Sequence, residues 1–304
     1  TSPTTWAGHT QGCEPSRRVM ERIPLAKPYW DEECERAAID ALSSGRWVKG
    51  PQAKQFGEEF AEWCGAISAV PCQSGSAALW AAMRILDIGP GDEVIVPGMT
   101  FIATATSVSL VGATPVFADI EQDYWCICPD DVEAKITDRT KAVIGVHIFG
   151  QTFSPRLKEI CQRHNIALVE DAAQAHGASL DGVKAGAIGD IACFSFFPSK
   201  NMAVGGEGGM ITTTRADLAE KMSRVVNHGR NNLLESVELG TNLRMSEVSA
   251  AIGRVQLKHL EHWTKQRQEN SKSINHKTKL RENAEHAWHQ LCVLAENPTE
   301  LIAK

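Results

Sequence analysis

Two patterns of apolar residues alternate along the chain from residue 29 onward. Short runs that are apolar almost throughout are typical of strands buried on both faces. Stretches with apolar residues at helical spacing stand between them. This alternation is typical of βαβ units and predicts an α/β fold with a mostly parallel sheet. The predicted strands are residues 93–96, 114–117, 142–146, 166–169, 191–195 and 210–213, and the predicted helices are residues 31–42, 52–64, 77–86, 216–226 and 246–260.

The pattern after residue 216 is helical rather than strand-like. We expect helix to continue beyond residue 260, with interruptions, as far as residue 294. A chain of 304 residues is therefore expected to hold one large domain of about 200–250 residues and a smaller, α-rich C-terminal part.

Composition and charge exclude several classes of protein. With 43% hydrophobic and 22% charged residues, the chain has ample apolar material for a core, so we expect neither disorder nor a fibrous repeat. A net charge of −6 without a basic cluster argues against a nucleic-acid partner. The longest apolar runs have the length of strands, so we expect no membrane segment.

The cysteines and the N-terminus indicate the compartment. Nine cysteines are an odd number and mostly stand singly, which is typical of a reducing compartment, so we expect a cytoplasmic protein. Residues 1–20 are polar and lack the apolar run of a signal peptide, and the initial Thr1 suggests a fragment or trimmed chain. Cys161 and His164 have a spacing that metal ligands use, but no second pair follows, so we expect no metal site.

Small residues precede the predicted helix 77–86, in the sequence Ser74-Gly75-Ser76-Ala77. They would let a ligand approach the backbone, where free amides and the positive end of a helix favour a phosphate. An ordinary serine N-cap explains the same residues equally well. The chain has no Gly-x-Gly-x-x-Gly after its first strand and no Gly-Lys-Ser/Thr loop, so dinucleotide and P-loop sites lose their main support.

Two acids, Glu170 and Asp171, follow the predicted strand 166–169. Ligands of open α/β sheets bind at the carboxyl ends of the strands. A carboxylate in a dry site there could pair with a protonated heterocyclic nitrogen and keep the ring an electron sink. The alternative is that Asp171 caps a helix that starts at Ala172.

Lys200 follows the predicted strand 191–195 and a proline turn, and it precedes a glycine cluster at residues 205–209. A lysine desolvated among apolar groups has a lowered pKa and can attack a carbonyl to form an imine. A solvated loop lysine is the alternative. A phosphate cradle, a carboxylate at a strand end and a desolvated lysine are together what pyridoxal 5′-phosphate requires.

Further motifs make this combination more specific. They are Gly91-Asp92-Glu93-Val94-Ile95-Val96-Pro97 with Thr100-Phe101, Glu170-Asp171-Ala172-Ala173-Gln174-Ala175-His176-Gly177, Phe194-Ser195-Phe196 with Lys200-Asn201, Gly206-Glu207-Gly208-Gly209, and Asn242-x-Arg244-Met245 with Ala250-Ala251-x-Gly253. Over about residues 23–260 the chain closely resembles the DegT/DnrJ/StrS family of pyridoxal-phosphate sugar aminotransferases. The resemblance implies the fold-type I architecture, with a large α/β domain and a small C-terminal domain, working as a homodimer.

The resemblance also implies roles for single residues. Lys200 would form the Schiff base with the cofactor and shuttle the proton, and Asp171 would pair with the pyridine nitrogen. Gln174 would lie beside the ring near its hydroxyl, and Phe101 would stack on the ring face. The implied phosphate contacts are Gly75, Ser76 and Ser195, together with Asn242 from the partner subunit.

The function implied by the resemblance is transfer of an amino group, with glutamate as the expected donor, to the keto carbon of a nucleotide-linked sugar or related cyclitol. Two alternatives stay open. A sugar dehydratase of the same family has His in place of the imine lysine, so Lys200 argues against it. A non-catalytic regulatory or scaffold protein on the same fold is the other.

The extent of the resemblance also predicts the domains. Residues 1–22 would be an N-terminal extension outside the match, expected to be disordered, and residues 23–260 the large cofactor-binding domain. Full-length relatives continue beyond this chain's end, and residues 275–304 match nothing in them. Residues 261–304 would therefore be the helical start of a small C-terminal domain that is truncated or divergent.

Overall fold

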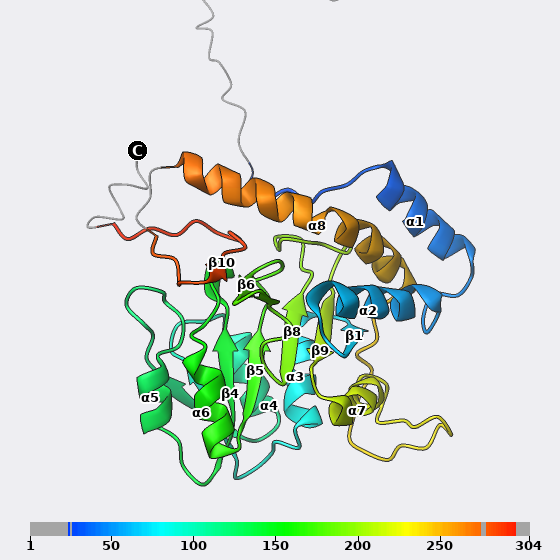
Figure 1. Cartoon of the computed structure of the whole chain (residues 1–304). Coiled ribbons are helices and arrows are strands. Elements are labelled where there is room, and N and C mark those ends of the chain that lie inside the picture. The colour runs from blue at the N-terminus through cyan, green and yellow to red at the C-terminus, as the bar shows by residue number, and fades with distance from the viewer. Residues whose placement is uncertain (1–23, 25, 275–277, 296–304) are drawn as a thin grey trace, which may run out of the picture.

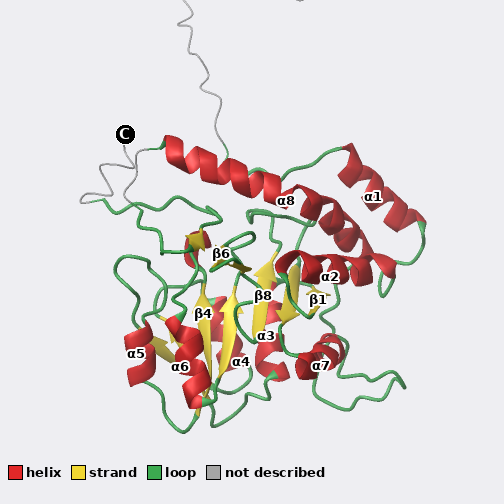
Figure 2. Cartoon of the chain, viewed as in Figure 1, coloured by secondary structure: helices red, strands yellow, loops and turns green. Residues whose placement is uncertain are grey.

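A seven-stranded sheet lies at the centre of the computed structural model, which describes residues 24, 26–274 and 278–295. The strand order is β1-β9-β8-β5-β4-β2-β3. Only β9 pairs with its neighbours in antiparallel fashion, so the predicted mostly parallel sheet is confirmed (Figure 2). The strands are β1 (Ser68–Cys72), β2 (Glu93–Pro97), β3 (Thr114–Ala118), β4 (Thr140–Val146), β5 (Ala167–Asp171), β8 (Ile191–Ser195) and β9 (Gly209–Thr213).

Helices cover both faces of this sheet (Figure 1). Successive strand residues point to opposite faces, and in β4 Ile144 packs into the cluster that α3, α4 and α7 share, whereas Val143 packs against α6. In β8, Phe194 packs into a third cluster, with residues of α2 and α8. The helices are α1 (Glu32–Ser43), α2 (Pro51–Cys64), α3 (Gly75–Ile85), α4 (Ala103–Leu110), α5 (Pro129–Ala134), α6 (Arg156–His164), α7 (Ala216–Val226) and α8 (Glu247–Ser273).

The sequence pattern did not predict α4, α5 and α6. The sequence of α4, ATATSVSL, is short and has no apolar stripe, and five of its eight residues are buried on different sides of the helix. Burial against the sheet and α3, rather than helical periodicity, stabilises α4. The pattern therefore could not distinguish this segment from a loop.

The chain beyond α8 differs from the expected helical tail. One continuous helix runs to Ser273, but residues 278–295 contain no helix. They include β10 (Ala284–Glu285), which joins β6 (Ser179–Leu180) and β7 (Val183–Lys184) in a small second sheet. The helix prediction for this stretch is wrong because most of its backbone hydrogen bonds reach other segments of the chain, such as β6 and residues 149–150, instead of following helical spacing. The domain division after residue 260 stays a prediction. The predicted N-terminal extension, residues 1–22, lies outside the residues that the structure describes, as do residues 275–277 and 296–304.

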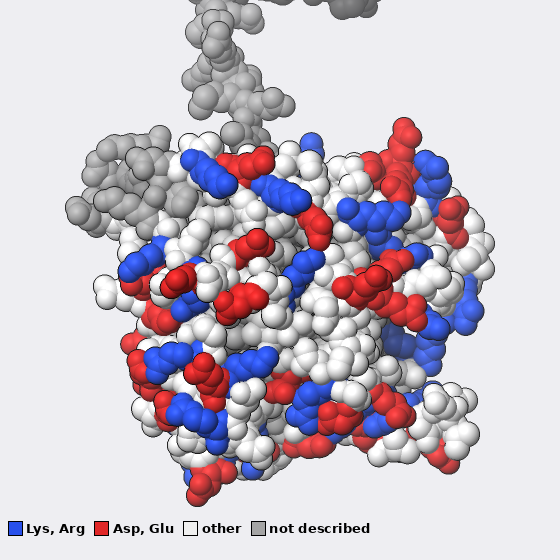
Figure 3. Space-filling model, viewed as in Figure 1, with Lys and Arg blue, Asp and Glu red and all other residues white. Residues whose placement is uncertain are grey.

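The surface in Figure 3 carries lysine and arginine side chains interspersed with aspartate and glutamate, with no large area of one sign on that face. Across the described ranges, no helix combines the length and the apolar character needed to cross a bilayer.

Candidate functional site

A cavity of about 420 Å³ opens at the edge where the parallel strands have their carboxyl ends. Its walls come from the start of α3, the loop before α4, and the segments that follow β4, β5 and β8. Seven of the eight predicted site residues line it, and these are Gly75, Ser76, Phe101, Asp171, Gln174, Ser195 and Lys200. The sheet topology thus brings together residues from four separate stretches of sequence.

Asn242 is the predicted residue that this cavity does not include. Its side chain is exposed, and its backbone forms an isolated bridge with Asn227. The next residue, Leu243, accepts a hydrogen bond from the amide of Gln73 at 2.8 Å. The segment of Asn242 therefore lies beside the loop between β1 and α3. The Asn242 side chain lies outside the cavity of its own chain.

The first turn of α3 forms one end of the cavity. Ser74 is the N-cap, since its Oγ accepts from the amide of Ala77 at 3.1 Å, so the N-cap interpretation is confirmed. Capping leaves the amides of Gly75 and Ser76 without an intrahelical partner, at the positive end of the helix. A Cβ on Gly75 would lie 2.7 Å from Cβ of Ser195. Only glycine lets α3 approach β8 this closely, and the result is a cradle of backbone amides and Ser195 suited to a phosphate.

Asp171 ends β5 with its carboxylate buried, at 6% exposure. Thr104 Oγ1 donates to Oδ2 at 2.7 Å, and the Ala173 amide donates to Oδ1 at 3.2 Å. Burial raises the Asp171 pKa, and the hydrogen bond from Thr104 lowers it in part. No helix begins at Ala172, so the alternative that Asp171 caps a helix is wrong.

Lys200 is half-buried at the cavity wall and is the only amine among the described lining residues. Burial lowers its pKa, and the negative charge of Asp171 raises it by a smaller amount. The solvated-lysine alternative is therefore not what the structure shows. A neutral, nucleophilic amine is more accessible here than on a surface lysine.

Gln174 and Phe101 lie on the remaining walls. Gln174 Oε1 accepts from the amide of Phe149 at 2.6 Å, so its amide nitrogen is the end left to meet a ligand. Phe149 itself has a left-handed backbone with φ of 57°. Phe101 lines the cavity, and 68% of its surface is exposed. An exposed aromatic ring of this kind can stack on a planar ligand.

Sequence reasoning missed a strap formed by residues 284–290, which lies beneath α8 over the end of the sheet (Figure 1). The strap amide of Ala287 donates to Gly150 O at 2.9 Å, and that of His289 donates to Phe149 O at 3.0 Å. Asn201, the residue after Lys200, donates from Nδ2 to Ala287 O at 3.2 Å and pairs through Oδ1 with His289 Nδ1 at 2.9 Å. The strap thus connects the segment of Lys200 to Phe149, whose amide donates to Gln174. Its position follows from contacts between distant segments, which the sequence pattern does not show.

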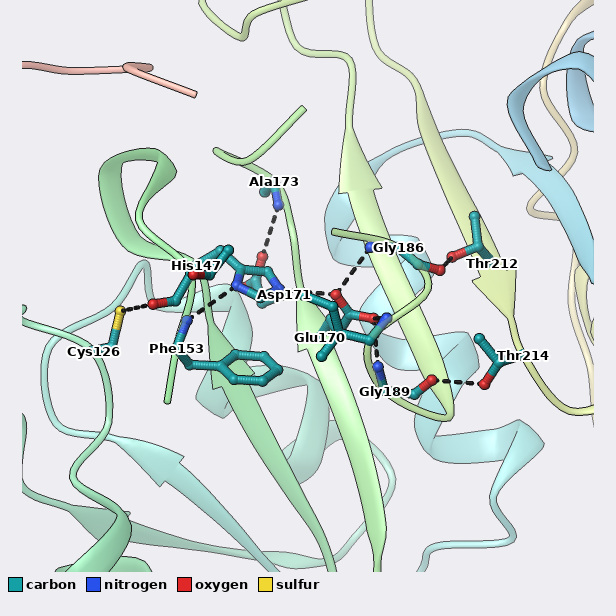
Figure 4. A network of polar contacts seen from close by, with 12 residues as sticks. Cys126, His147, Phe153, Glu170, Asp171, Ala173, Gly186, Gly189, Thr212 and Thr214 are labelled. Carbon is teal, nitrogen blue, oxygen red and sulfur yellow. Dashed lines mark hydrogen bonds and ion pairs between the residues drawn. The ribbon is translucent and has the colours of Figure 1, made fainter. Parts of the chain in front are cut away.

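Glu170, the other acid at this strand end, does not line the cavity and has a structural role (Figure 4). It is fully buried and accepts the amides of Gly186, Ile188 and Gly189 at 2.9, 2.8 and 2.7 Å. His147 Nε2 lies 2.8 Å from the same carboxylate. Because the Phe153 amide donates to Nδ1 of His147 at 3.3 Å, Nε2 is the nitrogen that donates to Glu170.

Glu170→Ala is expected to lower the free energy of unfolding by about 3 to 5 kcal/mol, because it leaves three buried amides and a buried histidine without their acceptor. Urea unfolding followed by circular dichroism measures the change. Glu58→Ala is the matched control, since Glu58 forms only an exposed pair with Lys54 at 3.7 Å, and it should cost about 1 kcal/mol or less. Equal costs in the two variants would show that Glu170 has no structural role.

Thiol and metal chemistry find no support in this part of the molecule. All eight cysteines of the described ranges are free thiols, and burial raises the pKa of Cys64 to about 11 and of Cys72 to about 12. Among the residues that the structure covers, no group of three or more His, Cys, Asp or Glu side chains is placed to hold a metal ion.

Comparisons with known proteins identify the family and the fold. A sequence profile of the DegT/DnrJ/EryC1/StrS aminotransferase family matches residues 28–303. The chain is 44% identical over 220 residues to UDP-N-acetyl-3-dehydro-alpha-D-glucosamine 3-aminotransferase of Acidithiobacillus ferrooxidans, covering 72% of this chain and 60% of that protein. It is 37% identical to a pleiotropic regulatory protein of Geobacillus stearothermophilus, covering 95% of this chain and 80% of that protein.

A solved structure gives the same result for the fold. The crystal structure of S. venezuelae DesV in complex with a ketimine intermediate superposes with a TM-score of 0.81 at 38% identity, covering 84% of this chain and 72% of that one. The expected fold class is therefore confirmed. This chain spans only 60% of the length of the A. ferrooxidans relative.

Proposed function

The chain belongs to the DegT/DnrJ/EryC1/StrS aminotransferase family, and on that premise we propose that it is a pyridoxal-phosphate-dependent aminotransferase of nucleotide-linked keto sugars, with glutamate as the amino donor. The observation that carries the proposal is one cavity that holds a desolvated lysine, a buried carboxylate and a cradle of helix amides. The name of the A. ferrooxidans relative, an aminotransferase of a UDP-linked sugar, supports the substrate class.

The residues present fit pyridoxal 5′-phosphate. The close approach of Gly75 to Ser195 leaves the α3 amides as the phosphate anchor, with no Cβ to block them. Asp171 lies at the end of β5 and has one oxygen held by Thr104 and the other by Ala173, which fixes the carboxylate toward a ring nitrogen. Phe101 and Gln174 line the space between these groups.

The protein's own groups then have separate tasks. When bound, the cofactor supplies a pyridinium ring that stabilises negative charge on a substrate carbon. Lys200 Nζ would be the group that binds the cofactor covalently, and as a free amine it would accept and return the proton of the donor's α-carbon. The Asp171 carboxylate keeps the ring nitrogen protonated through an ion pair in a site shielded from water.

The attachment of pyridoxal 5′-phosphate is expected to become faster as pH rises, because only the neutral amine attacks the aldehyde. Burial places the midpoint below 10.5, the ordinary lysine pKa. Asp171→Asn removes the charge that raises the Lys200 pKa, so its midpoint should lie at lower pH than that of the wild type. Absorbance time courses on cofactor-free protein measure this. Glu207→Gln is the control, a carboxylate at the cavity that does not perturb the Lys200 pKa, and a midpoint raised by Asp171→Asn would contradict the assignment.

Turnover on keto sugars linked to UDP, dTDP and GDP, with glutamate as donor, tests the proposed substrate class. We expect mass spectrometry to find an amino sugar from at least one of them. If glutamate transfers its amino group to the cofactor but no amino sugar forms, the proposed substrate class is wrong and the proposed aminotransferase activity stands. The dehydratase alternative predicts a product that gains no nitrogen.

The name of the G. stearothermophilus relative favours a second candidate, a regulatory protein on this fold. It predicts that the chain binds the cofactor and shows no transfer of nitrogen from any donor. The same assay therefore separates the two candidates.

We also propose a homodimer with shared sites. Phe101 and Phe197 line the cavity and are 68% and 45% exposed, and Ile102, next to Phe101 in the sequence, is 65% exposed. Exposed apolar side chains of this kind favour cover by a second protein surface. The exposed side chain of Asn242, outside the cavity of its own chain, would reach the cofactor phosphate of the partner.

Mixing inactive Lys200→Ala chains with inactive Asn242→Asp chains is expected to restore activity, because one of the two sites in each heterodimer then keeps both residues. Turnover per heterodimer should approach half of the wild-type value. Two Lys200→Ala chains carrying different tags are the control and should stay inactive. Proven heterodimers without activity, or a fully active monomer, would reject the shared site.

A further inference from the structure

A second cavity, of about 270 Å³, lies between one face of α8, residues 27–29 and residues 200–203. We refer to it as the α8 cavity. Lys200 is the only residue that it shares with the candidate active site. Apart from Lys200, its charged lining residues are Lys27 and Arg267, and none of the described residues contributes a carboxylate to its lining. The remaining polar side chains of the lining are Tyr29, Asn201, Gln256, Trp263, Gln266 and Asn270.

Arg267 in this cavity carries a largely buried charge that has no counterion among the described residues. It forms no ion pair within the described ranges, and its buried Nη1 has no hydrogen-bond partner there. Its Nη2 reaches only the carbonyl of Asn201, at 3.4 Å. By contrast, Arg281 pairs with Glu121, and Arg254, on the same helix, pairs with Glu59 at 2.7 Å. A buried charge left unpaired costs free energy. The cavity beside Arg267 has room for a negatively charged group that would pair with it.

The neighbouring groups cannot supply that partner. Gln256 is already engaged, since Nε2 donates to Tyr29 O at 2.8 Å and Oε1 accepts from Ala203 N at 3.4 Å. His176 and His289 face the same region, and their pKa values are lowered by burial and by the positive charges of Lys200 and Arg267. The surroundings of Arg267 are therefore positive or neutral, and they favour an anion.

We propose that the α8 cavity binds a small oxyanion, through a carboxylate or phosphate group seated on the planar edge of Arg267. A guanidinium donates two parallel hydrogen bonds to such a group, and Lys27 adds a second positive charge at the wall. The anion would lie next to the segment that Arg267 contacts at Asn201, directly after Lys200. The bound anion would contact Arg267 on the side of Lys200 that faces α8, outside the cofactor cavity.

Isothermal titration calorimetry on the full chain tests this site, with inorganic phosphate, succinate and the neutral analogue succinamide as probes. We expect phosphate or succinate to bind and succinamide not to bind. Tighter binding of phosphate would identify a phosphate ligand, and tighter binding of succinate a carboxylate. Absence of binding by both anions would overturn the proposal.

Titrations of variants test whether the anion binds at Arg267. Arg267→Met should weaken the anion by about tenfold or more, because a charge-assisted pair is lost. Arg254→Met, on the same helix, should leave the affinity unchanged. Ser195→Ala, which removes the hydroxyl of the cofactor cradle, should also leave it unchanged, which separates this site from the cofactor's phosphate anchor and from any failure of the proposed function. If Arg267→Met does not fold, Arg267→Lys keeps the charge without the planar edge and should show a smaller but measurable loss. Unchanged affinity in the Arg267 variants would overturn the proposal.

Discussion

Lys200→Ala is expected to abolish covalent attachment of pyridoxal 5′-phosphate and to lower amino transfer by about a thousandfold or more. No other amine lines the cavity among the described residues, so nothing replaces Nζ as the point of attachment or as the group that moves the α-carbon proton. Reduction with borohydride, digestion and mass spectrometry locate the fixed cofactor. In wild-type protein we expect it on Lys200 alone.

Lys184→Ala is the matched control for this experiment. Lys184 lies outside the cavity and pairs with Glu261 at 2.9 Å, so its loss should leave both the adduct and the rate unchanged. An adduct on another lysine, or cofactor-saturated protein without any adduct, would show that the assignment of Lys200 is wrong.

Asp171→Asn is expected to retain the cofactor and to lower turnover by about a hundredfold or more, the size of effect seen when one preorganised electrostatic group is removed. The amide oxygen can still accept from the Ala173 amide, and the amide NH2 can donate to Thr104 Oγ1, whose hydroxyl can turn to Thr100, so the local structure is largely kept. It cannot hold a proton on the ring nitrogen by charge, and the ring then stabilises the substrate carbanion poorly.

Cofactor content and kcat are measured on the same samples, so that binding and catalysis are separated. Thr104→Val is the companion variant, since it removes the hydroxyl that donates to Oδ2 and leaves the charge in place. We expect an intermediate loss for Thr104→Val. A rate near that of the wild type in Asp171→Asn would remove Asp171 from the mechanism.

Most of the cofactor cavity was predictable because it depends on strand ends. Apolar runs located six of the seven strands of the central sheet to within two residues, and β8 runs over residues 191–195 as predicted, whereas β1 was not predicted. Once the strands run parallel, Asp171 at the end of β5 and Lys200 after β8 must meet at one edge. The identity of the two roles came from the family resemblance, and the structure adds their burial and pKa directions.

The parts that could not be predicted depend on contacts between distant segments. Thr104 lies in the first turn of α4, four residues after Thr100, and their hydroxyls lie 2.8 Å apart, yet nothing in the sequence shows that this turn faces Asp171. The strap that reaches Asn201 comes from a stretch whose sequence pattern predicts helix. The unpaired state of Arg267 likewise follows only from what surrounds it in space.

The central claim is that this chain transfers an amino group through a cofactor held at Lys200, and its most direct test is a half-reaction with ¹⁵N-labelled glutamate. Wild-type protein loaded with pyridoxal 5′-phosphate is mixed with the labelled donor, denatured, and examined by mass spectrometry. The account predicts ¹⁵N-labelled pyridoxamine 5′-phosphate and an equal amount of 2-oxoglutarate from the wild type, and neither from Lys200→Ala. Loaded wild-type protein that yields no labelled cofactor with glutamate or any other amino donor would contradict it.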